Sequence, residues 1–233
     1  MTSRMEGGCA LIFDADDTLW ENNIYFERAF EDFCDFLDHS SLSPKQVRDV
    51  LNEIELANLK VHGYGSTNFG RSLAQAYQHL AEREIQESDL RHVMSLAERI
   101  LEQPIELIAG VEEMLDYLAG RHDLTLFTKG HIEEQRMKVD RSGLGRYFNH
   151  TAIVKEKDVP AYRRLTEERG FDPEKTWMIG NSPKSDINPA LEAGLNAVLV
   201  PHPHTWVLEH QDLRDGGSRF LRIGSLEELR VHF

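Results

Sequence analysis

Short apolar runs alternate with longer stretches of helical spacing over much of this 233-residue chain. Turn-forming residues bound each run, as is typical of buried strands. Between the runs, hydrophobic spacing favours helices, one beginning near Val111 and stopping at Gly120, another opened by Pro160 and closed by Gly170. The apolar runs lie at 9–14, 124–128, 151–154, 176–180, 196–200 and 219–223. This alternation predicts an α/β fold with a doubly wound parallel sheet.

Residues 21–104 interrupt this alternation, because they contain no convincing strand and carry four successive amphipathic helical patterns. The second pattern opens with Ser43 and Gln46, which are spaced as in a helix-capping box. We therefore predict a helical domain over residues 21–104, inserted after the first strand of a core that comprises residues 1–20 and 105–233.

Charge and composition narrow the range of partners. The chain has 26 Lys and Arg against 40 Asp and Glu, a net charge of −14, which repels nucleic acids and anionic membranes. We expect neither as a partner. Two cysteines, Cys9 and Cys34, are too few for a disulfide framework, and no leader peptide or membrane-spanning apolar run is visible. The sequence thus predicts a cytoplasmic protein, and it gives no signal of oligomeric state.

Polar residues gather where the expected strands end. Asp14 and Asp16 follow the first strand, and side chains two apart in an extended segment point the same way. Alone, this segment is equally typical of an ordinary turn. Later strand ends add Thr128, Lys129 and Gly130, then Lys155 and Lys157, then Asn181, Ser182 and Asp186. Because ligands of open α/β sheets bind beyond the carboxyl ends of the strands, we expect these groups to form one site.

The order of these groups resembles the four motifs of the haloacid dehalogenase superfamily, over residues 10–201. The resemblance implies a Rossmann-like catalytic core and makes the inserted helices its cap domain. The matching residues are Asp14, Asp16 and Thr18 for D-x-D-x-T, Thr128 for the second motif, Lys155 or Lys157 for the third, and Gly180, Asn181 and Asp186 for the fourth.

The resemblance implies a Mg²⁺-dependent phosphatase of a small phosphorylated metabolite, working through an aspartyl-phosphate on Asp14. Asp16 would be the general acid and base, a role that we expect to require a raised pKa, supplied in part by a neighbouring carboxylate. Thr128 would bind a phosphoryl oxygen and a lysine would supply positive charge. We favour Lys157 because it lies nearer the helix start, and Lys155 stays as the alternative.

The implied metal ligands are Asp14, the main-chain carbonyl of Asp16, and Asp186, because hard oxygen ligands suit Mg²⁺. The cation would offset the repulsion between the two carboxylates. Asn181 stands where many family members have aspartate, so the resemblance implies a weaker metal site in which Asn181 supplies a carbonyl oxygen or an outer hydrogen bond.

Three other functions stay open at this point. A haloacid dehalogenase typically lacks the second aspartate, so Asp16 argues against it. A phosphomutase would keep both aspartates, and a weakly active regulatory binding module would keep the fold. Nucleotide, sugar phosphate and phosphoglycolate are all candidate substrates.

Further residues are candidates for binding. Lys129 and Gly130 would join Thr128 at the phosphate, and a loop of the inserted helices would offer His62, Tyr64 and Asn68 to the leaving group, although an ordinary interhelical loop explains that segment equally well. The histidines of PHPHTWVLEH match no zinc spacing, so we expect them to be solvated. They are His202, His204 and His210.

Overall fold

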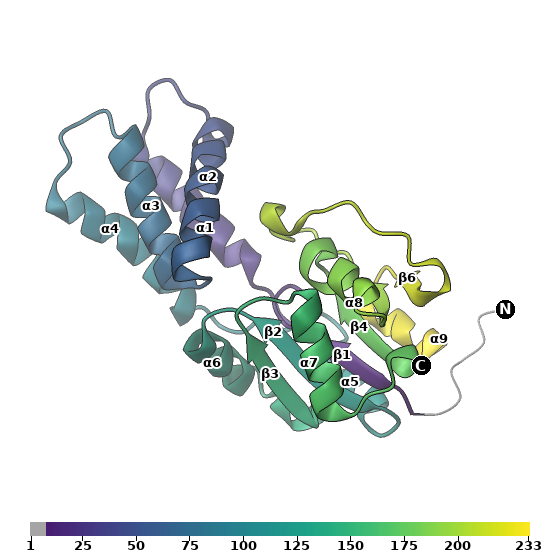
Figure 1. Cartoon of the computed structure of the whole chain (residues 1–233). Helices are drawn as coiled ribbons and strands as arrows, with labels where there is room; N and C mark the ends of the chain where they lie inside the picture. Colours follow the sequence, from purple (N-terminus) through teal and green to yellow (C-terminus); the bar gives the residue numbers. More distant parts are fainter. Residues whose placement is uncertain (1–7) are drawn as a thin grey trace. The chain divides into compact units, whose positions relative to one another are not determined.

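The computed structural model describes residues 8–233, which divide into two compact units. Unit 1 ends its first segment at Glu21 and resumes with Ile105–Phe233, and unit 2 is Asn22–Pro104. Unit 1 contains the sheet and unit 2 contains the helices α1 to α4 (Figure 1). Among residues 8–233, no helix combines the length and hydrophobicity needed to cross a membrane.

Unit 1 is built on a parallel sheet in the order β3-β2-β1-β4-β5-β6. The strands are β1 (Ala10–Phe13), β2 (Asp123–Lys129), β3 (His150–Val154), β4 (Thr176–Gly180), β5 (Asn196–Leu199) and β6 (Phe220–Arg222). The predicted doubly wound parallel sheet is confirmed. Strand order reverses between β1 and β4, and such a switch point is where ligands bind in this class of fold.

Helices cover both faces of this sheet (Figure 1). Alternate residues of β1 explain why: Leu11 and Phe13 pack into one apolar cluster with α5, and Ile12 packs into another with α7 and α8. The helices of unit 1 are α5 (Val111–Ala119), α6 (Ile132–Ser142), α7 (Val159–Arg169), α8 (Asn188–Glu192) and α9 (Leu229–His232). Short helical turns include η4 (Pro183–Ile187) and η5 (Val207–Glu209).

Helix α7 shows how local sequence fixes an element. The side chain of Asp158 accepts a hydrogen bond from the backbone N–H of Ala161 at 2.8 Å, which caps the first turn, and Pro160 fits there because it has no N–H to satisfy. Gly170 ends the helix with φ +65°, a conformation that glycine adopts without steric cost.

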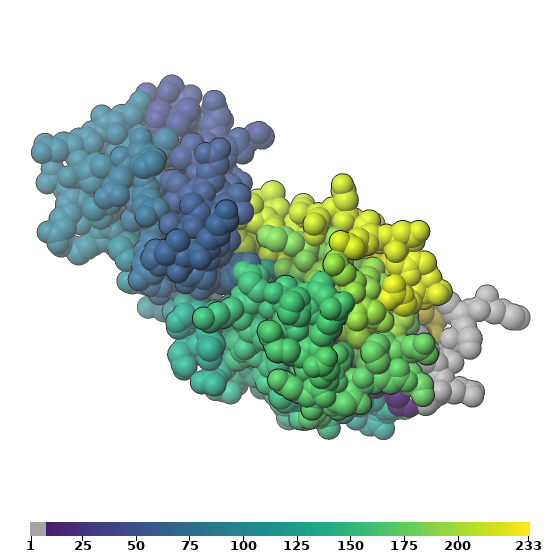
Figure 2. Space-filling model, in the orientation of Figure 1, coloured from purple at the N-terminus to yellow at the C-terminus, as the bar shows by residue number. Residues whose placement is uncertain are grey.

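The chain between β5 and β6 runs over the surface of unit 1, where it is drawn in yellow beside the light green of α8 (Figure 2). Nδ2 of Asn188 donates to the carbonyl of Asp212 at 2.9 Å, and Arg214 pairs with Glu192 at 2.8 Å. This segment therefore has fixed attachments to α8, and it carries His202 and Glu209.

Unit 2 consists of α1 (Asn23–Leu37), α2 (Pro44–His62), α3 (Ser66–Leu80) and α4 (Glu87–Glu98), followed by the turn η1 (Arg99–Glu102). The capping box predicted at Ser43 and Gln46 is confirmed, because each side chain bonds the other's backbone N–H. The four helices share one apolar core that includes Phe33, Leu51, Leu73, Tyr77 and Val93.

Candidate active site

Three ionisable side chains meet at the carboxyl end of the sheet in unit 1. Asp14 directly follows β1, Lys157 comes shortly after β3, and Asp186 lies in η4 after β4. All three are buried. Nζ of Lys157 donates to the carboxylate of Asp14 and, at 2.7 Å, to Oδ1 of Asp186. Lys155, the alternative, is exposed.

The electrostatics of this cluster favour a cation. The pKa of Asp14 is raised to about 7, mainly by burial and then by the charge of Asp186, while Lys157 opposes both. Burial disfavours the charged form of Lys157, but Asp14 and Asp186 outweigh it and raise the pKa of that ammonium. When both carboxylates are ionised, the single ammonium of Lys157 balances only one of them, so the buried cluster keeps one negative charge.

Thr18 and Asn181 stand beside Asp14. Oγ1 of Thr18 lies within hydrogen-bond distance of Oδ2 of Asp14, at 3.3 Å, and of Oδ1 of Asn181, at 3.2 Å. The amide nitrogen of Asn181 donates to the hydroxyl of Thr205 at 2.9 Å. The amide oxygen and nitrogen of Asn181 thus both have protein partners. This arrangement is typical of a residue that orients the side chains around a site without binding the ligand itself.

Asp16 is held by donors from α6 and from its own turn. Nζ of Lys138 lies 2.9 Å from both carboxylate oxygens, Nε2 of Gln135 donates at 2.9 Å, and Nε1 of Trp20 donates at 2.8 Å. Burial alone would raise the pKa of Asp16, but Lys138 and these hydrogen bonds together lower it. The expectation of a raised pKa is therefore wrong. The expectation took into account the neighbouring carboxylate, which would raise the pKa, but not the ammonium of Lys138 on α6, which lowers it.

The end of β2 contributes Thr128, Lys129 and Gly130. Thr128 is buried. The ammonium of Lys129 bonds to Oγ of Ser185 at 2.7 Å and to Oε1 of Glu209 at 2.6 Å, so it links β2 to η4 and η5. Gly130 has φ +148°, and a Cβ there would come within 2.8 Å of the Gln135 amide. Glycine at this position therefore leaves room for a partner of Asp16.

Glu209 is a site residue that sequence reasoning missed. Its carboxylate is buried and accepts hydrogen bonds from the hydroxyls of Ser182, at 2.6 Å, and Ser185, as well as from Lys129. Burial alone would raise the pKa of Glu209, but Lys129 and the hydrogen bonds of Ser182 and Ser185 together lower it. Tyr162 adds a hydrogen bond from its hydroxyl to the carbonyl of Ser185 at 2.8 Å. Together these contacts fix the turn that carries Asp186.

The loop residues predicted in unit 2 differ in their surroundings. His62 is exposed at the end of α2, and Tyr64 is partly buried. Asn68 is buried and donates to the carbonyl of Gly63 at 2.6 Å, so its amide closes its own loop. Within unit 2, Asn68 therefore has a structural role, and the roles of His62, Tyr64 and Asn68 toward a leaving group stay predictions.

Comparison with known proteins places this geometry in context. A family model described as haloacid dehalogenase-like hydrolase matches residues 10–194. Pyrimidine 5'-nucleotidase PynA of Streptococcus pneumoniae is 26% identical over 228 residues, covering 88% of this chain and 93% of that protein. Pyrimidine 5'-nucleotidase YjjG of Escherichia coli is 23% identical, covering 94% and 95%. A crystal structure of a haloacid dehalogenase-like family hydrolase from Xanthomonas campestris has a TM-score of 0.83 at 27% identity and covers 97% of this chain and 95% of its own.

Proposed function

The chain belongs to the haloacid dehalogenase-like hydrolase family, whose model matches most of its length, and we propose that it is a Mg²⁺-dependent phosphatase that hydrolyses a small phosphomonoester through an aspartyl-phosphate on Asp14. One observation carries the proposal: the carboxylates of Asp14 and Asp186, from separate strand ends, bind the same ammonium of Lys157. A phosphoryl group bound there would meet a nucleophile and a fixed positive charge together.

The donor set fits Mg²⁺. Asp14 and Asp186 are buried oxygen donors, and the charge of Asp186 raises the pKa of Asp14, so the pair gains from a divalent cation. We propose these carboxylates and the main-chain carbonyl of Asp16 as the protein ligands. Asn181 would not bind the metal itself but would hydrogen-bond to Thr18 beside the ligands. When bound, the cation supplies positive charge to the phosphoryl oxygens.

Different side chains carry out the steps of the proposed reaction. A carboxylate oxygen of Asp14 attacks phosphorus, a P–O bond forms, and the bond to the leaving oxygen breaks. Asp16 gives that oxygen a proton and afterwards takes one from the water that cleaves the aspartyl-phosphate. Since Lys138 lowers the pKa of Asp16, the ionised form that the second step needs is favoured, and the first step uses the protonated form that the second step restores. Thr128 and Lys157 stabilise charge on the phosphoryl oxygens.

For the substrate we propose a pyrimidine nucleoside 5'-monophosphate. The support is that two relatives matching nearly the whole chain carry the name pyrimidine 5'-nucleotidase. We further propose that unit 2 is a cap domain and selects the leaving group, with the loop of His62, Tyr64 and Asn68 taking part. Asp16 argues against a dehalogenase, which would need no proton for its leaving group.

A panel of phosphomonoesters tests this function. It includes pyrimidine and purine nucleotides, sugar phosphates and phosphoglycolate, each assayed with Mg²⁺ and with EDTA. We expect pyrimidine nucleotides to be hydrolysed fastest, with no turnover in EDTA or in the Asp14→Asn variant. Hydrolysis that survives both EDTA and this substitution would contradict the mechanism, and a preference for another phosphomonoester would contradict the substrate alone. Return of the phosphoryl group to a bound sugar phosphate would instead identify a mutase.

A further inference from the structure

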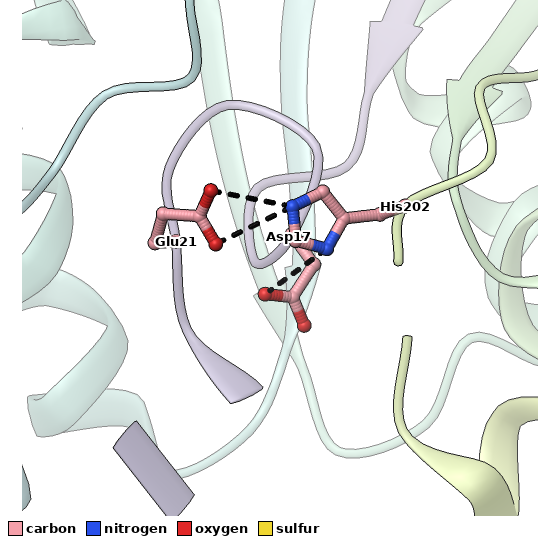
Figure 3. Close-up of side chains that lie close together, drawn as sticks. All are labelled: Asp17, Glu21 and His202. Atoms are coloured by element: carbon pink, nitrogen blue, oxygen red, sulfur yellow. Dashed lines mark hydrogen bonds and ion pairs between the residues drawn. The ribbon is translucent and has the colours of Figure 1, made fainter. Parts of the chain in front are cut away.

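Three side chains from two segments of unit 1 meet outside the Asp14–Asp186 cluster. Figure 3 shows the imidazole of His202 between the carboxylates of Glu21 and Asp17. Nε2 of His202 lies 3.3 Å from Oε2 and 3.4 Å from Oε1 of Glu21, and Nδ1 lies 3.9 Å from Oδ1 of Asp17. One ligand atom from each residue can be chosen so that all three lie within 4.8 Å of one another.

We propose that Asp17, Glu21 and His202 bind a divalent transition-metal cation of the Zn²⁺ class, at a site made of different side chains from the proposed Mg²⁺ site. An imidazole nitrogen with two carboxylate oxygens is a donor set that Zn²⁺ accepts, leaving a fourth position for water. Tetrahedral bonds of roughly 2.0–2.2 Å place donor atoms about 3.3–3.6 Å apart. The distance from Nε2 of His202 to Glu21 already matches, and Asp17, whose ligand atom lies within 4.8 Å of the other two, must move closer by up to about 1.5 Å.

Charge and burial support a cation. The side chains of Asp17 and His202 are 6% and 10% exposed, and that of Glu21 is 29% exposed. Two carboxylates beside one imidazole carry a net negative charge even when the imidazole is protonated, so an ion pair alone leaves one charge uncompensated. A divalent cation that replaces the ring proton compensates both carboxylates.

One oxygen of Glu21 gives an independent indication. Oε2 is shielded from solvent and accepts no hydrogen bond from any residue between 8 and 233. A buried acceptor of this kind loses its hydration without a hydrogen bond in return, which costs free energy. It is also the oxygen nearest to Nε2 of His202. A metal bound between these two atoms satisfies both.

The position of the site explains why the sequence did not reveal it. The histidine-rich run contributes a single side chain to the cluster, since His204 is exposed and its ring lies 5.8 Å from that of His202. The other donors come from the turn after β1, far away in the sequence. A bound ion would join this turn, which ends where the chain leaves unit 1 at Glu21, to the segment after β5.

Calorimetric titration of the full chain with Zn²⁺, in excess Mg²⁺, tests the site. Glu21→Gln keeps the size of the side chain and removes a ligand, and His202→Ala removes the imidazole. His204→Ala is the matched control. We expect both ligand variants to bind Zn²⁺ more weakly than the wild type, by more than the roughly tenfold to hundredfold that loss of an outer partner costs. The His204→Ala variant should bind as the wild type does.

Cobalt gives a spectroscopic readout of the same site. A four-coordinate Co²⁺ ion with an imidazole ligand absorbs visible light strongly, whereas a six-coordinate oxygen site absorbs weakly. We expect the strong bands in the wild type and in His204→Ala, and their loss in Glu21→Gln and His202→Ala. If Zn²⁺ affinity and the Co²⁺ spectrum are the same in Glu21→Gln as in the wild type, the proposal is overturned. If His202→Ala does not fold, the Glu21→Gln variant still tests the proposal, because Glu21 is partly exposed.

Discussion

The ammonium of Lys138 lies 2.9 Å from both carboxylate oxygens of Asp16. This contact joins α6 to the turn after β1, where the proposed general acid and base stands. Both side chains are largely shielded from solvent, so their attraction is stronger than that of a surface pair. The protonation of Asp16 therefore depends on a residue outside the motif that identifies it.

Replacing Lys138 with methionine should raise the pKa of Asp16, because the main charge that lowers it is removed. The limb of the pH–rate profile that reports Asp16 should move to higher pH. The measurement is kcat/KM against pH for the best substrate. The exposed Lys155→Met variant is the control and should keep the wild-type profile. An unchanged profile in Lys138→Met would mean that the ionisation seen in the pH–rate profile is not that of Asp16.

Replacing Lys157 with methionine should reduce kcat by about a hundredfold or more, because a preorganised charge at the phosphoryl group is lost. The same change at exposed Lys155 should leave kcat close to the wild type. Circular dichroism should verify that both variants are folded, since Lys157 separates two buried carboxylates. An equal loss of activity in both variants would contradict the assignment of Lys157.

Replacing Gly180 with alanine should displace Asp186. A Cβ at Gly180 would collide with the carboxylate of Asp186 and lie 2.9 Å from its Cβ. Misplacement of a catalytic group by about 1 Å can cost roughly a hundredfold in rate, and we expect a loss of that order in steady-state assays. Gly120→Ala is the control, because that position faces open space. Full activity of Gly180→Ala would show that Asp186 is not needed in its observed place.

Replacing Glu209 with alanine should destabilise unit 1 by about 3 kcal/mol, because Lys129 then loses its buried partner. The side chains of this pair are 13% and 9% exposed. The control is Glu192→Ala, which breaks a pair whose side chains are 59% and 45% exposed and should cost about 0.5 kcal/mol. Tryptophan fluorescence in urea reports the change, since Trp20, Trp177 and Trp206 all belong to unit 1. Similar midpoints for the two variants would contradict this prediction.

Glu55 should make unit 2 sensitive to pH. Its pKa is raised from 4.5 to about 7, mainly by burial; Arg48 opposes this shift and Glu27 adds to it. The folded state then holds the proton more tightly than the unfolded state, so the free energy of unfolding falls as pH rises from about 4.5 to about 7. Glu55→Gln should remove this fall and add about 2 kcal/mol of stability at pH 8.

The measurement for Glu55 is thermal or urea unfolding followed by far-ultraviolet circular dichroism between pH 5 and pH 8. Exposed Glu53→Gln is the matched control on the same helix, and its pH dependence should equal that of the wild type. Glu55→Gln being less stable than the wild type at pH 8 would mean that the carboxylate has a stabilising partner.

The strands could be predicted from the sequence because each buried strand of a parallel sheet is a short apolar run closed by turn residues. The polar groups at their ends could also be predicted to lie near one another, since parallel strands end at the same edge of the sheet. Asp14, Lys157 and Asp186 are brought together in this way.

Contacts made by helix surfaces and long loops could not be predicted. Lys138 and Gln135 have the polar spacing of an ordinary exposed helix face, and nothing local says that this face meets Asp16. Glu209 is a single acid in a loop, and His202 lies 181 residues from Glu21. Such contacts depend on how the chain returns to the sheet, and they leave no periodic pattern in the sequence.

The central place of β1 has a consequence for the way this protein is made. β1 pairs with β2 and β4, both of which follow unit 2 in the sequence. Since domains generally fold as they leave the ribosome, the helical unit can be complete while the four apolar residues of β1 still have no partner strand. A nascent chain that stalls near residue 104 would expose an unpaired apolar strand, and we expect such chains to aggregate or to need a chaperone until β2 and β4 emerge.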